Sequence, residues 1–593
     1  MATTDRTGPD GAPPGGGEPP GRTPGWQRSA RRYGPVAAVA ALVAGAVVVF
    51  GGGSGDDGDS GGGEAAEVAG GDELIRSGPM TPQRAELEGV DLADVDFGPH
   101  CDTETGRLAL PMVQVPPCVE RFEGDKLGAT SPGVTGDEVR IVYYQTDPAL
   151  DPLGAATIGE IGADVNAETA QQAVDAYADL YNEYYETYGR RVVVESFVGS
   201  GASDDVAAAR ADAIAIAEKE PFAVIGGPAQ VLSTFAPEIA SRGIVCGPDC
   251  SGAAPEEVIE EYAPYLWSTG PTPDQAVALA AEMVASLAGS GPAELAGDPA
   301  LQASDRVYGV VHYDTADGEH EPVFRSLEDA LADNGIELAT DVEYQLDLAR
   351  LQENARTMVT KLKEAGVTTV IFYGDPITPG PLTAEATAQG YQPEWILGPN
   401  VLADTTIFAR GYDGEQWRNG FGMALAPARA ERDLMDAFRL HRWAYGEDAP
   451  NNTVRVLEPP VRTIFAGVHM AGPELTPETF RDGLLRLPVY GGGPTVPQVS
   501  RGEHGVWPSF DWGGIDDVGL LWWDPEATGP DEVGADGTGM YRYALGGRRY
   551  TIGELPGSLE EAGLFDAGSS VTVHDDLPEE DWVPDYPPPT VSG

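Results

Sequence analysis

The sequence predicts an α/β protein with two doubly wound parallel-sheet lobes joined by a hinge, preceded by an N-terminal membrane helix. Three observations predict this organisation. Strand and helix signals alternate from Val139 onward, a second series of the same kind starts after Pro273, and an uncharged apolar run comes before both series. Strands that alternate with helices are typical of parallel sheets whose faces are covered by helices.

The N-terminus combines a polar stretch with an apolar run. Residues 1–34 are rich in Gly and Pro and contain few large apolar side chains, so we expect a disordered cytoplasmic segment. Residues 35–53 carry no charge, follow Arg31 and Arg32, and precede an acidic linker, which favours a transmembrane signal anchor with the N-terminus inside. The apolar part is short for a spanning helix, so a cleaved signal peptide and a secreted protein are the alternative.

The four cysteines indicate how disulfides cross-link the exported part of the chain. We expect a single-pass protein of the cell membrane with the bulk of the chain outside the cytoplasm, where disulfides form. The cysteines then suggest two local disulfides, Cys101 with Cys118 and Cys246 with Cys250. The first would staple an N-terminal extension within residues 54–132. A zinc site is the alternative for the second pair, although no pair of His residues lies nearby.

The first lobe is expected over residues 133–267. Its strand signals are short apolar or β-branched runs, separated by loops that contain Gly or Pro. Its first helix carries apolar side chains at spacings of three and four, as at Ala170, Val174 and Tyr177. The expected strands are residues 139–144, 191–198, 222–227, 243–247 and 265–270, and most of them are separated by helices.

The second lobe is expected over residues 268–400 and repeats this pattern. Its strand signals are RVYGVVHY, ELATDVEYQL, VTTVIFYG and EWILGPN, and each is followed by a helix or a loop. Helical segments in residues 401–500 are expected to return to the first lobe, and aromatic strands in residues 501–556 to the second. Residues 557–593 have the composition of an acidic, Pro-rich tail.

The charge and the motifs argue against nucleic-acid binding and against catalysis. The formal net charge is −59, from 95 acidic and 36 basic residues, whereas binding to phosphates needs clustered Lys and Arg. No Lys follows a Gly, which excludes a P-loop, and no His begins a His-Glu-x-x-His zinc motif. The one Gly-x-Ser-x-Gly motif, at 58–62, lies in the linker. We therefore expect no enzyme and no cofactor.

A cation site is considered in the acidic segment after the RVYGVVHY strand. Asp314, Asp317 and Glu319 lie there, with His312 and His320 nearby, and such a set could hold calcium. The segment lacks the alternating oxygen-ligand spacing of a dedicated calcium loop, so we expect no metal site.

The order of elements resembles a known family. The run from GVTGDEVRIVYY to GIVCG, followed by DRVYGVVHYDTADGE, TKLKEAGVTTVIFYGD and GYQPEWILGPN, is similar to type I periplasmic binding proteins, the branched-chain amino-acid (Leu/Ile/Val) binding components of ABC transporters. The similarity covers roughly residues 133–490. It implies that a ligand binds between the lobes, at loops that follow the carboxyl ends of strands.

The resemblance implies a first group of ligand contacts at one helix N-terminus. The loop GGPAQVLSTFAPEIA stands where the family presents hydroxyls and backbone amides to a ligand carboxylate, which Gln230, Ser233 and Thr234 would do here. The alternative is that Ser233 and Thr234 only cap the helix. Asp249 and Ser251 occupy the next loop of the family pattern, and a Cys246–Cys250 bridge would make that loop rigid.

Further candidates lie at the ends of other strands, and two of them depart from the family pattern. Asp317 stands where the family has an aromatic residue, and Asn400 where it has an acidic one, which argues against an α-amino-acid ligand because Asn carries no charge. The remaining candidates are Tyr144, Thr146, Tyr373 and Asp375, for which strand-end packing is the alternative.

These observations predict a membrane-tethered protein whose lobes close on a small molecule. As an import component it would dock on an ABC permease in the membrane. A ligand-sensing receptor without transport is the alternative, and a hydrolase acting at the cell envelope is the least favoured one.

Overall fold

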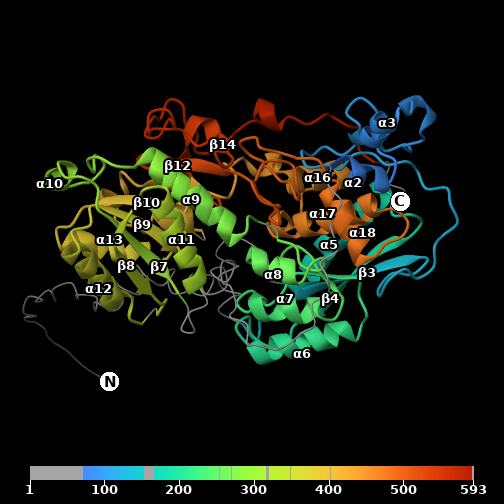
Figure 1. The fold of residues 1–593 in the computed structure, drawn as a ribbon, viewed down its shortest axis with the longest axis horizontal. Helices are drawn as coiled ribbons and strands as arrows, with labels where there is room; N and C mark the ends of the chain where they lie inside the picture. Colours follow the sequence, from blue (N-terminus) through green and yellow to red (C-terminus); the bar gives the residue numbers. More distant parts are fainter. Residues whose placement is uncertain are drawn as a thin grey trace, which may run out of the picture.

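Two lobes lie side by side in the computed structural model, each with a sheet that is covered by helices (Figure 1). The structure describes residues 71–151, 166–252, 254–268, 270–314, 320–347, 349–400 and 402–589. The two-lobed α/β fold that the sequence predicts is confirmed. The expected signal anchor at residues 35–53 lies outside the described residues, and no helix among those described is long and apolar enough to cross a membrane.

The first lobe is built on a four-stranded parallel sheet in the order β4-β3-β5-β6. Side chains of β3 alternate between two cores, because Val139 and Ile141 pack with α5 and α17 while Val142 and Tyr144 pack with α6 and α7. A strand buried on both faces is rich in apolar residues, and five of the eight residues of β3 are apolar or aromatic. The elements of this lobe are β3 (Glu138–Gln145), α5 (Ala167–Tyr184), β4 (Arg191–Val198), α6 (Val206–Ala217), β5 (Ala223–Ile225), α7 (Leu232–Ala240), β6 (Val245–Cys246) and α8 (Glu256–Glu261).

The second lobe contains an eight-stranded mixed sheet in the order β13-β12-β11-β10-β9-β7-β8, with β14 paired to β12. Its parallel part is covered by α9 and α11 on one face and by α12 and α13 on the other. A Thr272 capping box and Pro273 begin α9. The elements are α9 (Pro273–Leu287), α10 (Pro299–Gln302), β7 (Tyr308–Tyr313), α11 (Glu321–Asp333), β8 (Leu338–Tyr344), α12 (Leu351–Glu364), β9 (Thr369–Gly374), α13 (Pro379–Ala388), β10 (Glu394–Asn400), α14 (Thr406–Ala409), α15 (Gly414–Trp417), β11 (Phe421–Ala424), β12 (Val518–Pro530), β13 (Asp536–Tyr543) and β14 (Arg549–Tyr550).

The boundary that we expected at residue 401 differs from the structure. Residues 402–424 stay in the second lobe, because β11 pairs in parallel with β10 and antiparallel with β12. Only α16 (Asp436–Tyr445), α17 (Val454–Ala471) and α18 (Pro477–Leu485) return to the first lobe, where α17 packs against α5. Four residues of β11 are too few for a recognisable strand period, so the sequence pattern did not reveal it.

The N-terminal extension packs on the returning helices of the first lobe. Arg486 donates from Nε to the carbonyl oxygen of Leu74 at 2.8 Å, and the His469 ring contacts the carbonyl oxygen of Pro117. The structure pairs Cys101 with Cys118 in this extension and Cys246 with Cys250 after β6. The extension contains α2 (Gly71–Ser77), α3 (Pro82–Glu88), β1 (Cys101–Asp102) and β2 (Arg107–Leu108).

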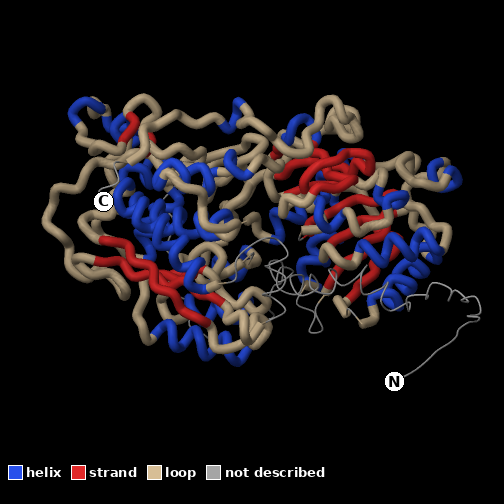
Figure 2. The backbone as a smooth tube through the Cα atoms, turned by 180° about the vertical axis from the view of Figure 1, so that it is seen from behind, coloured by secondary structure: helices blue, strands red, loops and turns tan. Residues whose placement is uncertain are grey.

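The chain passes from one lobe to the other three times, before α9, between β11 and α16, and between α18 and β12. Its C-terminal segment also runs from the second lobe to the first. Val571 pairs with Tyr543 in the second lobe, and His574 pairs with Ala430 in a crossing segment. Tyr586 donates its hydroxyl to Asp102 in the N-terminal extension on the first lobe. Long loops join the lobes along this side (Figure 2). We call residues 571–589 the C-terminal strap.

Candidate ligand-binding site

The strand-end loops of each lobe lie along one edge of its sheet. Because β3, β5 and β6 run parallel, the loops that follow them share an edge, and the loops after β7, β9 and β10 do the same in the second lobe. Helices α7 and α8 lie on the side of the first lobe that is turned toward the second (Figure 1). This edge holds most of the residues that the sequence predicted.

A chain of hydrogen bonds joins three of these loops in the first lobe. Gln230 donates from Nε2 to the hydroxyl of Ser203 at 2.9 Å, and its backbone amide donates to the carbonyl oxygen of Ser203. The Ser203 hydroxyl donates to Asp151 Oδ2 at 2.6 Å. The network therefore fixes the loops after β3, β4 and β5 relative to one another. Sequence analysis selected Gln230 and missed Ser203 and Asp151, although Ser203 lies in a Gly- and Ser-rich loop directly after a strand.

The start of α7 is shaped by two glycines and has no side-chain cap. Gly226 has a φ of +72°, and a Cβ at Gly227 would lie 2.5 Å from Leu232. Ser233 and Thr234 are half-buried in the first turn, while the N-cap is Val231, so the alternative that these hydroxyls cap the helix is wrong. Backbone amides at an uncapped helix start favour a polar or anionic group.

The disulfide loop after β6 presents one acid and anchors one serine. Asp249 is half-buried with a φ of +66° between the bridged cysteines. Burial, and then the charge of Asp249, raises the pKa of Tyr143. Ser251 is instead buried and donates its hydroxyl to the carbonyl oxygen of Trp267 at 2.6 Å. Ser251 therefore holds the loop in place.

Three other predicted contacts are buried inside the lobes, where packing accounts for them. Tyr144 is 3% exposed and its hydroxyl donates to Asp212 at 3.0 Å. Tyr373 packs in the core beneath α9 and α11. Asp375 is fully buried and accepts hydrogen bonds from the Tyr344 hydroxyl, the Thr378 hydroxyl and two backbone amides. Its carboxylate organises the turn into α13.

In the second lobe, a half-buried acid, Asp404, follows Asn400. The Asn400 side chain donates to Gly398 and accepts from the amide of Asp404 at 3.2 Å. Burial, and then the charge of Glu532, raises the pKa of Asp404 to about 7, while its own backbone amide acts in the opposite direction. Asp404 is therefore an acidic residue in the same loop, four residues after Asn400.

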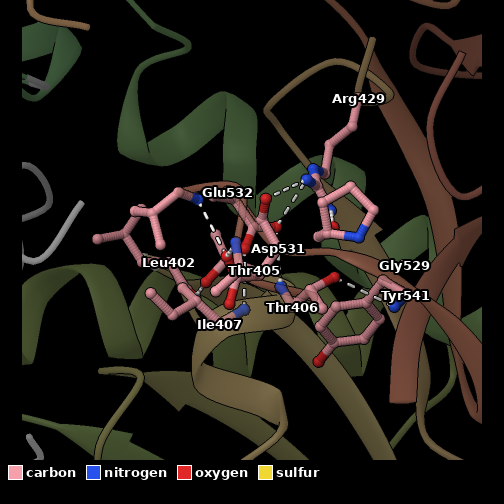
Figure 3. Close-up of polar contacts among 12 residues, drawn as sticks. Leu402, Thr405, Thr406, Ile407, Arg429, Gly529, Asp531, Glu532 and Tyr541 are labelled. Carbon is pink, nitrogen blue, oxygen red and sulfur yellow. Dashed lines mark hydrogen bonds and ion pairs between the residues drawn. The ribbon is translucent and has the colours of Figure 1, made fainter. Parts of the chain in front are cut away.

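A side chain already occupies the helix start beside this loop. Figure 3 shows Glu532 of the β12–β13 hairpin at the first turn of α14, where its oxygens accept from the amides of Thr406 at 2.9 Å and Ile407 at 2.8 Å. The Nε of Arg429 lies 3.6 Å from Glu532. An anionic ligand would find these amides occupied, in contrast to the start of α7.

The site as described is polar and acidic. The described loops after β3, β4, β5, β6, β9 and β10 contain no Lys or Arg, and they bring Asp151, Asp249 and Asp404 to the strand ends. Thr146 is half-buried directly after β3. Asp317 lies outside the described residues. Such loops can orient a small molecule through hydrogen bonds and can favour positive charge.

The chain is similar to one protein family and to several solved structures. A family model described as periplasmic binding protein matches residues 160–508, which is more than half of the chain. A comparison with curated proteins finds no match. Solved structures with a similar fold include a fatty acid ABC transporter substrate-binding protein from Thermomonospora curvata, with 14% identity, a TM-score of 0.45, and coverage of 72% of this chain and 95% of that one.

Two further solved structures have the same kind of similarity. A putative branched-chain amino acid ABC transporter protein from Rhodospirillum rubrum has 15% identity, a TM-score of 0.43, and coverage of 65% of this chain and 97% of that one. A solute-binding protein of an ABC transporter from R. palustris, in complex with 4-hydroxybenzoate, has 12% identity, a TM-score of 0.47, and coverage of 71% and 98%.

Proposed function

The chain belongs to the periplasmic binding protein family, and from that premise we propose that it binds a small solute between its two lobes outside the cytoplasm and delivers it to an ABC-type permease. The proposal includes a tether at residues 35–53 and no catalytic role. Binding would draw the lobes together, because a ligand that contacts both lobes favours the closed state.

The observation that carries the proposal is the strand-end edge of the first lobe. There the Gln230–Ser203–Asp151 hydrogen bonds fix three loops beside the uncapped start of α7. Loops that are already ordered lose little conformational entropy when a ligand binds. We propose Ser233 and Thr234 as direct contacts, with Gln230 and Thr146 lining the same edge.

The charges of the loops favour one class of solute. Asp249 is half-buried in the disulfide loop of the first lobe, and Asp404 lies in the second lobe after β10. With acids on both lobes and no Lys or Arg in the described loops after β3, β4, β5, β6, β9 and β10, the matching solute is small, polar and rich in hydrogen-bond donors, or positively charged. Asn400 and Asp404 would contact it from the second lobe.

A thermal-shift screen of the full chain tests the proposal. The solutes are amines, amino acids, amides, short peptides, polyols and aromatic acids. At a concentration 100 times Kd, a solute stabilises the protein by about 2.7 kcal/mol, which raises Tm by about 5–10 °C for lobes of this size. If only aromatic acids raise Tm, the charge argument is wrong, and if no solute does while a substrate is turned over, the binding function is wrong.

Matched variants on one helix then locate the site. Ser233→Ala removes a hydroxyl at the start of α7, and Ser241→Ala removes an exposed hydroxyl at the end of the same helix, where it donates to Glu238. The loss of one hydrogen bond of about 1 kcal/mol weakens binding by about fivefold. We expect this change in Kd, measured by calorimetry with the solute from the screen, for Ser233→Ala only.

A further inference from the structure

Two of the segments that cross between the lobes are joined by hydrogen bonds, and together they form part of the hinge. The segment between α18 and β12 contains a hairpin at residues 498–516, in which Val499 pairs with Ile515. We call these residues the hinge hairpin. Three hydrogen bonds attach it to the crossing before α9 and to the first turn of α9. They join the Gly514 amide to the Gly270 carbonyl oxygen (2.8 Å), the Arg501 guanidinium to the Ser268 carbonyl oxygen (3.1 Å), and Gln275 Nε2 to Asp511 Oδ1 (2.7 Å).

Two buried carboxyl groups of the hinge hairpin, Asp511 and Asp516, contact the same hydroxyl. The Ser500 hydroxyl lies 3.2 Å from Asp511 Oδ2 and 2.8 Å from Asp516 Oδ2. A hydroxyl has one hydrogen to donate, so two ionised carboxylates would leave one of these buried contacts without a hydrogen. A proton on one carboxyl group supplies that hydrogen and removes the repulsion between the two acids. The geometry therefore indicates that the pair holds one proton.

The hydrogen-bond partners of each carboxyl group favour Asp516 as the protonated acid. Asp511 Oδ1 accepts from Gln275 at 2.7 Å and from the amide of Gly513 at 2.9 Å, and such bonds favour an ionised carboxylate. Asp516 Oδ1 accepts a longer bond of 3.3 Å from Trp507 Nε1. Burial, and then the charge of Asp511, raises the pKa of Asp516 to about 8, and a hydrogen bond to Asp511 acts in the same direction.

The charges around the pair are balanced when only one of the two acids is ionised. The guanidinium of Arg501 is buried in the same hairpin, and its Nε has no hydrogen-bond partner. Burial lowers the pKa of Arg501, and the charges of Asp511 and Asp516 act in the opposite direction. The other charged groups on neighbouring elements are paired with one another or are acidic, namely Asp517 with Arg549, Arg462 with Glu458, Asp274 of α9, and Glu256 and Glu260 of α8. A second ionised acid would therefore set two negative charges against one buried guanidinium.

We propose that Asp511 and Asp516 share one proton that stabilises the hinge, and that loss of this proton lets the two crossing segments separate, so that the lobes take up a wider range of positions. The repulsion would act on the bond between Asp511 and Gln275, whose Oε1 accepts from the amide of Thr272 in the crossing before α9. The two segments are closely packed there, because a Cβ at Gly513 would lie 2.2 Å from Gln275 Oε1. Any effect on solute affinity rests on the proposed function.

The pH range of this response follows from the protonation of Asp516. In the intact hinge the pKa of Asp516 is about 8, whereas a solvated Asp loses its proton near about pH 4. The intact hinge is therefore most favoured below about pH 4, becomes less favoured between about pH 4 and 8, and changes no further at higher pH. Within this range, each pH unit shifts the ratio of separated to intact hinges by up to about tenfold.

The distance between the lobes tests the proposal. Ala211→Cys on α6 and Thr360→Cys on α12 place spin labels at exposed positions of the two lobes, while the four native cysteines are paired in disulfides. The full chain without solute is measured by double electron–electron resonance at pH 5 and pH 8. We expect a second population of distances, whose ratio to the first rises at least about tenfold between these pH values. In Asp516→Asn the ratio should stay constant, because the amide keeps a donor toward Asp511 at every pH.

Glu503→Gln is the matched control, because it removes a carboxylate from an exposed position of the same hairpin. Its distances should change with pH like those of the parent chain, and circular dichroism checks that each variant is folded. The proposal is overturned if the parent chain shows the same ratio at both pH values, if Asp516→Asn follows the parent, or if Glu503→Gln loses the response. No solute is present in these measurements, so failure here leaves the proposed solute binding untouched.

Discussion

Replacing Asp375 with Ala tests whether this side chain holds the fold or binds the ligand. The carboxylate is fully buried, and its removal leaves four buried donors without their acceptor, namely the hydroxyls of Tyr344 and Thr378 and the amides of Ile377 and Thr378. Each orphaned buried group costs about 1–3 kcal/mol. Burial also raises the pKa of Asp375, so removing the carboxyl recovers part of that penalty. We expect a net loss of about 4 kcal/mol, near the upper end for single substitutions.

Asp413→Ala provides the control for this loss. Asp413 also ends a loop at a helix start, but it accepts only from the amides of Glu415 and Gln416 and is partly solvated. Loss of such a cap costs about 1 kcal/mol. Urea unfolding, followed by circular dichroism and tryptophan fluorescence, gives both values. If Asp375→Ala is no less stable than Asp413→Ala, or if it abolishes solute binding at unchanged stability, the structural role assigned to Asp375 is wrong.

Three further predictions concern other parts of the molecule. Burial, and then a neighbouring carboxylate, raises the pKa of Asp516 to about 8. The protonated Asp516 therefore contributes its full stability below about pH 4, and this stability is lost as the pH rises through 8. Calorimetry should show that Asp516→Asn gains Tm relative to the parent between pH 5 and 8. Arg306 pairs with Glu394 at 2.8 Å in the interior. In urea unfolding, Glu394→Ala should lower the free energy of unfolding by about 3–5 kcal/mol, and replacement of both residues by Met should lower it much less. Equal losses in the two variants would contradict this prediction. Peptide mapping without reduction should find Cys101 joined to Cys118, and replacing both by Ser should cost about 3 kcal/mol, whereas free thiols at these two positions would refute the pairing.

The alternation of strands and helices was enough to predict the lobes. The strand expected at residues 139–144 is β3, because a run of β-branched and aromatic residues between Gly-containing loops has few other structures available. Short elements were harder to predict from the sequence. β11 has four residues, and its place between β10 and β12 depends on pairing with strands that are distant in the sequence.

The candidate site shows where sequence reasoning ends. Tyr143 and Tyr144 are adjacent at the end of one strand, and their side chains point to opposite faces of the sheet. The sequence prediction named Tyr144, which is buried against Asp212, whereas Tyr143 is only half-buried on the other face. The face that each residue takes depends on which helices cover the sheet. Likewise, Ser203 and Asp151 are brought together across 52 residues by the packing of two loops.

The C-terminal strap sets a mechanical limit on how far the lobes can part. Asp581 is buried and accepts hydrogen bonds from the amide and hydroxyl of Thr495, while Tyr586 is fastened to Asp102 and Trp443. His574 and Thr495 both lie beside the crossing segment at Ala428 and Ala430, so the attachment on the first lobe is Tyr586. Four residues separate Asp581 from Tyr586, and an extended chain reaches only about 3.3–3.6 Å per residue. Once this slack is taken up, any wider swing of the lobes must pull Tyr586 away from Asp102 and Trp443. The segment therefore works as a tether of fixed length, whose far-side attachment is the first to yield when the molecule is forced open.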